Sequence, residues 1–272
     1  MIKLRSGARQ AQHWRTSSTD SRNSGGPAFR RTDIFLEPFE DGICVCDNLT
    51  KTHRLLFNKY PCREHHVLVV TKHREQQGEL LNFEDFKASL IVLRAFQSNA
   101  VVFYNSSPTA GASQSHKHLQ VMPVASIPGK KVPINERAME TLSRNKASAD
   151  EQGFVLPEYV NMRHHFSPIE PDLIAKPGTD EELKEVAKQL ERIYMQTLKQ
   201  VNNPEGRVAY NFAMTKDWML IMVRRHPEYR GLHVNTLGFL GLLFADSEEK
   251  VKLIEETRPL EVLRALAMPM HD

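Results

Sequence analysis

Cysteine is scarce in this sequence of 272 residues, which holds only Cys44, Cys46 and Cys62. The number is odd, and no two of them form a Cys-x-x-Cys pair. This argues against a disulfide framework and against an all-cysteine zinc site, because both need paired or regularly spaced cysteines. Free thiols of this kind fit a reducing compartment, so we expect the protein to be cytoplasmic.

Long apolar runs are also missing. The longest uncharged apolar run near the C-terminus covers residues 237–245, which is about half of what a membrane-spanning helix requires. We therefore expect no membrane partner.

Acidic residues are nearly absent from residues 1–31, where seven basic residues stand against Asp20 and give a net charge of +6. The whole chain carries +3, so the remainder is mildly acidic and nothing favours a nucleic-acid partner. The first residues are rich in Arg and Ser, as in organelle transit peptides, but they lack a clear amphipathic apolar face. We interpret residues 1–28 as a basic arm, flexible or weakly helical, with organelle targeting as the alternative.

The pattern of the next hundred residues is typical of an α+β domain. Segments rich in β-branched or aromatic residues predict strands at 42–48, 53–58, 66–71 and 101–104. Asn82 predicts the start of a helix, since Asp85 three residues on completes a capping box and apolar residues follow at helical spacing. This order predicts a mainly antiparallel sheet with flanking helices over residues 29–125.

The rest of the chain divides into an irregular and a regular part. Proline and glycine interrupt residues 126–180, where only 163–166 indicate a strand, and we interpret this as a connecting segment. Beyond it the sequence predicts a C-terminal α+β part over residues 181–272. Its expected elements are a helix at 181–201, a hairpin of 207–212 with 217–224, and helices at 248–256 and 260–267.

The most informative stretch is 104–122, which reads as a strand, a loop of small residues and a second strand. His116, His118 and Gln120 follow one another at a spacing of two, so we expect all three side chains on one face of that strand. Polar groups on an otherwise apolar strand need partners, because burying each one unpaired costs about 2–7 kcal/mol. The preceding loop is rich in Ser, Gly and Ala, which lets backbone N–H groups approach an anion.

From the residues alone, three interpretations of the two histidines stay open. They are structural, or they bind a metal as a His-x-His pair, or one of them attacks a phosphorus as a neutral imidazole. The metal interpretation lacks further ligands, because no cysteine or acidic residue lies close in sequence. Similarly, Arg224 and Arg225 end a predicted strand, and they are either solvated or placed to bind a polyphosphate.

The run from Asn105 through His116-Lys117-His118-Leu119-Gln120 resembles the histidine-triad superfamily, in its His-x-His-x-Gln transferase branch. Within that branch the sequence is similar to the ATP adenylyltransferases, also called diadenosine tetraphosphate phosphorylases. Two further blocks resemble the same family in the same order. They are 58–60 with 66–72, and 210–211 with 218–220 and 234–239.

The resemblance implies a histidine-triad-like fold and a nucleotidyltransferase that cleaves diadenosine tetraphosphate with inorganic phosphate. It implies that His118 is the nucleophile that takes up AMP, supported by His116 and Gln120. The residues expected to bind phosphate or ribose are Lys59, Asn105, Ser106, Gly111, Ser113, Gln114 and Ser115. No tightly bound cofactor and no protein metal site are implied, although Mg²⁺ is expected to accompany the polyphosphate. A dinucleotide hydrolase, a sugar-phosphate nucleotidylyltransferase and a non-catalytic nucleotide-binding module are the alternatives.

Glutamine in the third position has a physical consequence. A histidine there would act as a proton donor near neutral pH, whereas Gln120 offers only neutral hydrogen bonds. Gln120 would therefore hold a phosphoryl oxygen without activating water, which favours phosphate as the second attacker. The sequence departs from the family pattern at His73, Ser107 and Ser115, and these departures concern substrate preference more than mechanism.

Overall fold

The structure is a computed structural model that describes residues 2–4, 33–146, 153–170, 172–174 and 178–270. One eight-stranded sheet runs through it in the order β2-β3-β4-β6-β5-β8-β9-β7, with every neighbouring pair antiparallel. The strands are β2 (Cys44–Cys46), β3 (His53–Phe57), β4 (Val67–Thr71), β5 (Ala100–Asn105), β6 (His118–Pro123), β7 (His164–Pro168), β8 (Tyr210–Met214) and β9 (Trp218–Val223). The predicted α+β class and mainly antiparallel sheet are confirmed.

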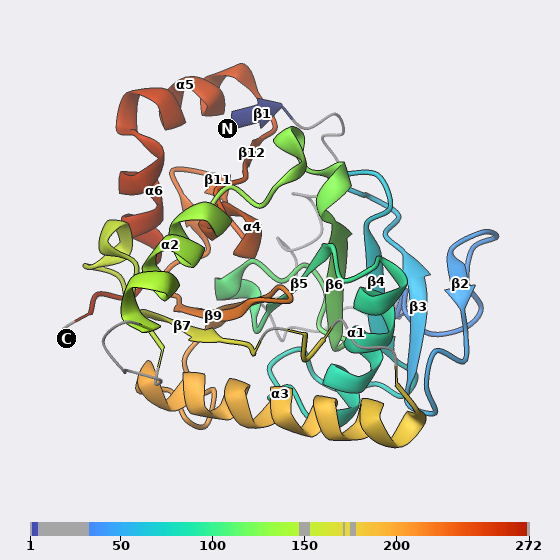
Figure 1. Ribbon diagram of the computed structural model, residues 1–272. Coiled ribbons are helices and arrows are strands. Elements are labelled where there is room, and N and C mark those ends of the chain that lie inside the picture. Colours follow the sequence, from blue (N-terminus) through green and yellow to red (C-terminus); the bar gives the residue numbers. More distant parts are fainter. Residues whose placement is uncertain (1, 5–32, 147–152, 171, 175–177, 271–272) are drawn as a thin grey trace.

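Two helices cover one face of the sheet, α1 (Phe83–Ala95) and α3 (Asp180–Gln200), and α3 is the long gold helix along the bottom of Figure 1. Both begin with a capping box, at Asn82 and Thr179 respectively. Between the helices and the sheet lies a buried core that includes Val69, Leu119 and Phe212. The predicted helices at these places, and the direction of Leu119 and Val121 into the core, are confirmed.

The other face carries the C-terminal elements, which surround a second core that includes Phe103, Met122 and Trp218. These elements are α4 (Thr236–Phe239), β12 (Leu243–Ala245), α5 (Glu248–Thr257) and α6 (Pro259–Leu266), with a small hairpin of β10 (Glu228–Tyr229) and β11 (Leu232–His233). The helix α2 (Asn135–Lys146) of the connecting segment packs against the same core through Ala138 and Leu142. None of the helices in the described part of the chain is long and apolar enough to cross a bilayer.

Two parts of the fold differ from expectation or add to it. Residues 126–180 contain the helix α2 in addition to the predicted strand β7. Ile2–Leu4 form a short strand, β1, parallel to β12, so these residues are not part of a free arm. An edge strand such as β12 offers unpaired backbone groups, which a neighbouring segment can bind in this way. The rest of the predicted arm and its linker lie outside the described residues.

Candidate active site

His118 is the first residue of β6, a central strand that pairs with β4 and β5. Its ring is almost completely buried, with 3% of the residue exposed. Nδ1 donates a hydrogen bond of 2.8 Å to the backbone oxygen of His116, which fixes the tautomer and leaves the lone pair on Nε2. Burial lowers the pKa of His118 to about 4, so the ring is neutral at physiological pH and suited to act as a nucleophile.

His116 supports this arrangement from just outside the strand. β6 begins at His118, and His116 forms an isolated bridge with Gln76, so His116 is not the strand residue that its spacing predicted. Its Nδ1 lies 2.9 Å from Oδ2 of Asp33, and its Nε2 lies 2.9 Å from both Oγ1 and the backbone oxygen of Thr71. Both ring nitrogens are thus occupied by the protein, and they fix the peptide whose oxygen orients His118.

Asp33 and Phe35 belong to the site although no sequence pattern marked them. The Phe35 ring packs against His118 at 5.0 Å and against His116 at 5.8 Å between ring centroids. Phe35 is buried together with Leu56, Leu68 and Val70 in a small core on the His118 side of the sheet. This apolar cover excludes water from the imidazole, which is the physical cause of its low pKa.

Gln77 is a further residue that the sequence did not reveal. Its buried side chain accepts a hydrogen bond from the backbone N of His118 at 2.9 Å and donates one to the backbone oxygen of His118 at 3.3 Å. The same amide nitrogen donates to the backbone oxygen of Asn105 at 2.8 Å. The side-chain amide of Gln77 therefore replaces the backbone hydrogen bonds of a neighbouring strand at the point where β5 and β6 separate. In this way it holds the backbone of His118 in place.

The loop between β5 and β6 is tightly built. Ser107 accepts a hydrogen bond from the backbone N of Ala110, across the 3₁₀ turn Pro108–Ala110. Gly111 has a φ of +89°, and a Cβ at this position would lie 2.9 Å from Cβ of Asn235 and 3.0 Å from the backbone oxygen of Val234. Only glycine fits there, because the conformation and the contact both exclude a side chain.

Asn105 and Ser106 have structural partners within the protein, and their role as phosphate or ribose ligands stays a prediction. Oδ1 of Asn105 is buried and accepts hydrogen bonds from Asn211 Nδ2, from Thr236 N and from Thr236 Oγ1, at 2.7 to 3.0 Å. Oγ of Ser106 accepts a hydrogen bond of 2.8 Å from the backbone N of Tyr210. Both side chains tie the loop to the C-terminal part of the chain.

Arg224 extends this anchor. It is 1% exposed, and its guanidinium donates to the backbone oxygens of Ala110, Val234, His226 and Leu266 and to Oδ1 of Asn211. No carboxylate of the described residues forms an ion pair with it. Burial lowers the pKa of Arg224 to about 9, so it stays charged at neutral pH. Arg224 is thus a buried anchor of the loop, and the expectation of a solvated side chain or a polyphosphate ligand is wrong for it.

The remaining predicted residues lie around the loop and the strand. Ser113 and Gln114 are half-buried, and Ser115 is exposed and accepts a hydrogen bond of 3.3 Å from Arg74. Gln120 is half-buried two residues after His118, and therefore on the same face of β6. A guanidinium beside the loop was not predicted, because Arg74 is distant from it in sequence.

Lys59 does not join this group. It is exposed, pairs with Glu40, and follows β3 at the end where Phe57 lies beside Val67. His118 lies beside Val70, toward the other end of β4. The prediction that Lys59 binds phosphate is therefore not supported by its position. Within the described ranges no group of three or more His, Cys, Asp or Glu side chains is placed to hold a metal ion.

Comparisons with known proteins agree with this site and fold. Residues 4–141 match the family model of the Ap4A phosphorylase N-terminal domain, where Ap4A is diadenosine tetraphosphate, and residues 158–269 match that of the ATP adenylyltransferase C-terminal domain. A diadenosine tetraphosphate phosphorylase of Saccharomyces cerevisiae is 26% identical, over 93% of this chain and 82% of that protein.

Solved structures of the yeast Ap4A phosphorylase Apa2 have the same fold. The complex with AMP has a TM-score of 0.67 at 25% identity and covers 88% of this chain and 82% of Apa2. The complex with Ap4A has a TM-score of 0.66 at 22% identity and covers 88% and 81% respectively. With both domain models matched in order along the chain, this protein belongs to the Ap4A phosphorylase family of ATP adenylyltransferases.

Proposed function

We propose that this chain phosphorolyses diadenosine tetraphosphate to ATP and ADP through an adenylyl group carried by His118. The family and the names of the yeast relatives support the substrate and the reaction class. The observation that carries the mechanism is the buried, neutral ring of His118, whose Nδ1 proton is committed to the oxygen of His116. A ring held in this way presents one nucleophilic atom, Nε2.

The reaction has two balanced steps. Nε2 of His118 attacks the α-phosphorus, the bond from that phosphorus to the bridging oxygen breaks, and ATP leaves with the bond electrons. An oxygen of inorganic phosphate then attacks the same phosphorus, the phosphorus–nitrogen bond breaks, and ADP leaves while the ring returns to its neutral form. Gln120 holds a phosphoryl oxygen with a neutral hydrogen bond, so it does not activate water for a competing hydrolysis.

The loop residues bind the polyphosphate in this proposal. Ser113, Gln114 and Ser115 surround the anion with backbone N–H groups and hydroxyls, and a divalent cation such as Mg²⁺ accompanies the substrate. Gly111 shapes the turn beside them, because its own N–H donates to the backbone oxygen of Pro108 at 2.9 Å. Arg74 adds a half-exposed guanidinium at the same loop.

The test is incubation with adenosine-labelled Ap4A in the presence and absence of phosphate. The reaction is quenched in alkali, because phosphorus–nitrogen bonds are labile in acid, and is followed by intact mass and peptide mapping. Without phosphate we expect one AMP on the peptide that contains His118 and release of one equivalent of ATP. With phosphate we expect ADP in continuous turnover. AMP released without phosphate as fast as ADP is formed with it would identify a hydrolase instead.

The low pKa of His118 predicts an unusual pH profile for the first step. We expect the adenylation rate without phosphate to stay level down to roughly pH 5 and to fall as the pH approaches 4, where the ring takes up a proton. An acidic limb near the ordinary histidine value of 6.5 would contradict this.

Stability should follow the same titration. In the unfolded protein the His118 ring takes up a proton below about pH 6.5, whereas in the folded protein it does so only near pH 4. The free energy of unfolding therefore declines as the pH falls from 6.5 to 4. The depressed pKa corresponds to up to about 3 kcal/mol. His164 adds a similar loss, because burial lowers its pKa to about 4 as well. Urea unfolding at each pH measures both losses together and shows whether the enzyme is folded where the rate is read.

A further inference from the structure

Lys117 stands between the two histidines in sequence but points to the opposite face of the sheet. Alternation along an extended chain places neighbouring side chains on opposite sides, and the Lys117 side chain is completely buried. Its Nζ lies 2.7 Å from Asp85 Oδ2, 2.9 Å from the backbone oxygen of Leu80 and 3.3 Å from Glu75 Oε2. All three ammonium protons therefore have an acceptor.

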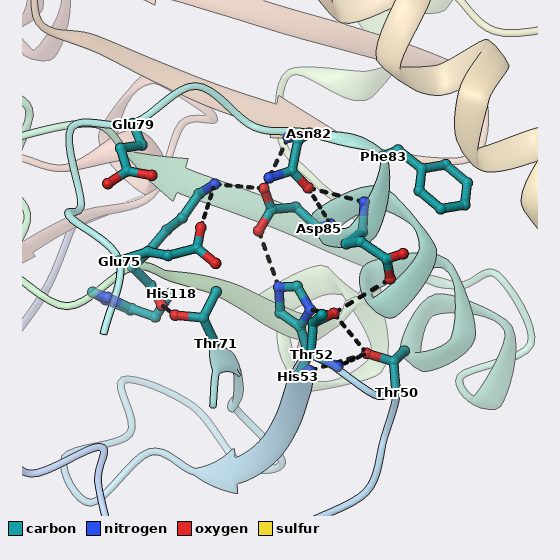
Figure 2. Close-up of polar contacts among 12 residues, drawn as sticks. Thr50, Thr52, His53, Thr71, Glu75, Glu79, Asn82, Phe83, Asp85 and His118 are labelled. Carbon is teal, nitrogen blue, oxygen red and sulfur yellow. Dashed lines mark hydrogen bonds and ion pairs between the residues drawn. The ribbon is translucent and has the colours of Figure 1, made fainter. Parts of the chain in front are cut away.

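Asp85 is the centre of this group, as Figure 2 shows with Glu75 on one side and His53 on the other. Its Oδ2 also accepts a hydrogen bond of 2.8 Å from the backbone N of Asn82, and its Oδ1 lies 3.0 Å from Nε2 of His53. Burial favours the protonated acid, but the His53 hydrogen bond and the charge of Lys117 outweigh it and lower the pKa of Asp85. The carboxylate thus joins the first turn of α1 to the start of β3 and to the residue before the nucleophile.

Stability alone does not require such a pair, because apolar residues of similar volume often replace a buried ion pair at no cost. The pair instead fixes the register of residues 116–118 relative to the sheet. If the chain slipped by one residue, Lys117 would face the His118 side and a histidine would face Asp85. The backbone reinforces this register, since the Lys117 N–H donates to the oxygen of Glu75 at 2.9 Å and His116 bridges Gln76.

We propose that Lys117 and Asp85 are a positioning pair for the nucleophile, holding residues 116–118 from the reverse face of the sheet so that Nε2 of His118 meets the phosphorus. Asp33 and Thr71 hold His116 on one face, and Asp85 holds Lys117 on the other. The inference rests on the proposed adenylyl transfer at His118.

The test removes both charges together with K117M/D85N, which keeps the shape of both side chains. A positioning pair predicts a thermal midpoint close to that of the unchanged protein, a kcat lower by about 10- to 100-fold and a KM that is little changed. The adenylation rate without phosphate should fall by the same factor as kcat. The single variant K117M leaves the Asp85 carboxylate buried and unpaired, and its midpoint should fall by roughly 10 °C.

K87M/D180N is the control for the loss of an ion pair on α1, because Lys87 Nζ lies 3.0 Å from Asp180 Oδ1 and joins α1 to α3. Its kcat should be unchanged. If K117M/D85N does not fold, E75Q carries the test, since it weakens only the outer contact of Lys117, and a kcat lower by about 2- to 5-fold is expected.

An unchanged kcat in a folded K117M/D85N, or in E75Q where the double variant fails, overturns the positioning pair. Failure of the proposed function gives a different result, because the unchanged protein would then not transfer AMP to His118 at all.

Discussion

Replacing His118 with asparagine should abolish turnover of Ap4A, with kcat lower by on the order of 10⁴-fold or more, while the nucleotide still binds. Asparagine preserves a polar side chain on the same face of β6 but has no ring nitrogen to attack phosphorus. The measurements are steady-state phosphorolysis, labelled-AMP transfer to the protein, and Ap4A affinity by calorimetry.

The chain offers a matched control in His164→Asn. His164 is also buried, its Nδ1 donates to the backbone oxygen of Met162 at 2.7 Å, and burial lowers its pKa to about 4. It lies in the edge strand β7, which three strands (β5, β8 and β9) separate from β6 and His118. His164→Asn should lower stability and leave kcat nearly unchanged, which separates the loss of a buried imidazole from the loss of the nucleophile. Residual turnover of His118→Asn above about 1% of the unchanged protein would contradict the role of His118.

Replacing Arg224 with methionine should lower the free energy of unfolding by about 3–5 kcal/mol. Methionine fills part of the volume but leaves Asn211 Oδ1 and the backbone oxygens of Val234 and His226 without the donor that Arg224 supplied. Asn211 in turn donates to the backbone oxygen of Ala110 at 2.7 Å. Because this asparagine loses the donor that holds it, the loop should be anchored less firmly, and kcat/KM should fall at least about 10-fold at temperatures where the variant is folded. Urea unfolding and steady-state kinetics check both effects.

Two variants sharpen this test. Arg224→Lys keeps the charge but supplies three donors from a single point, so it should recover only part of the stability. Arg225→Met changes the exposed neighbour and should alter the free energy of unfolding by less than about 0.5 kcal/mol. Equal effects at positions 224 and 225 would show that the buried contacts of Arg224 do not anchor the loop.

The elements with strong local signals could be predicted from the sequence. The capping box at Asn82 and Asp85 marked α1, and the spacing of His118 and Gln120 placed both on one strand face. The helix α2 could not be recognised, because in a mainly polar segment such as Asn135–Lys146 burial depends on contacts such as those of Ala138 and Leu142 with the second core.

The site was predictable only where its residues are close in sequence. The fold brings three distant residues into contact with the histidines: Asp33, Phe35 and Gln77. Their neighbours in sequence form no motif that indicates this role. Asn105 shows the reverse case, a residue whose structural partners the sequence does not indicate. An asparagine before a Ser- and Gly-rich loop suggests a ligand, but its partners Asn211 and Thr236 come from more than a hundred residues away.

The continuity of the sheet has a consequence for how the protein is made. The N-terminal family domain ends before β8, yet β8 is the neighbour of β5 along Val102–Asn105. Until β8 has left the ribosome, the backbone N–H and C=O groups along this edge of β5 lack their partners, and such edges recruit other chains. Because one sheet runs through both family domains, we expect them to fold as one unit. A nascent or truncated chain that ends before β8 should therefore depend on chaperones to escape aggregation.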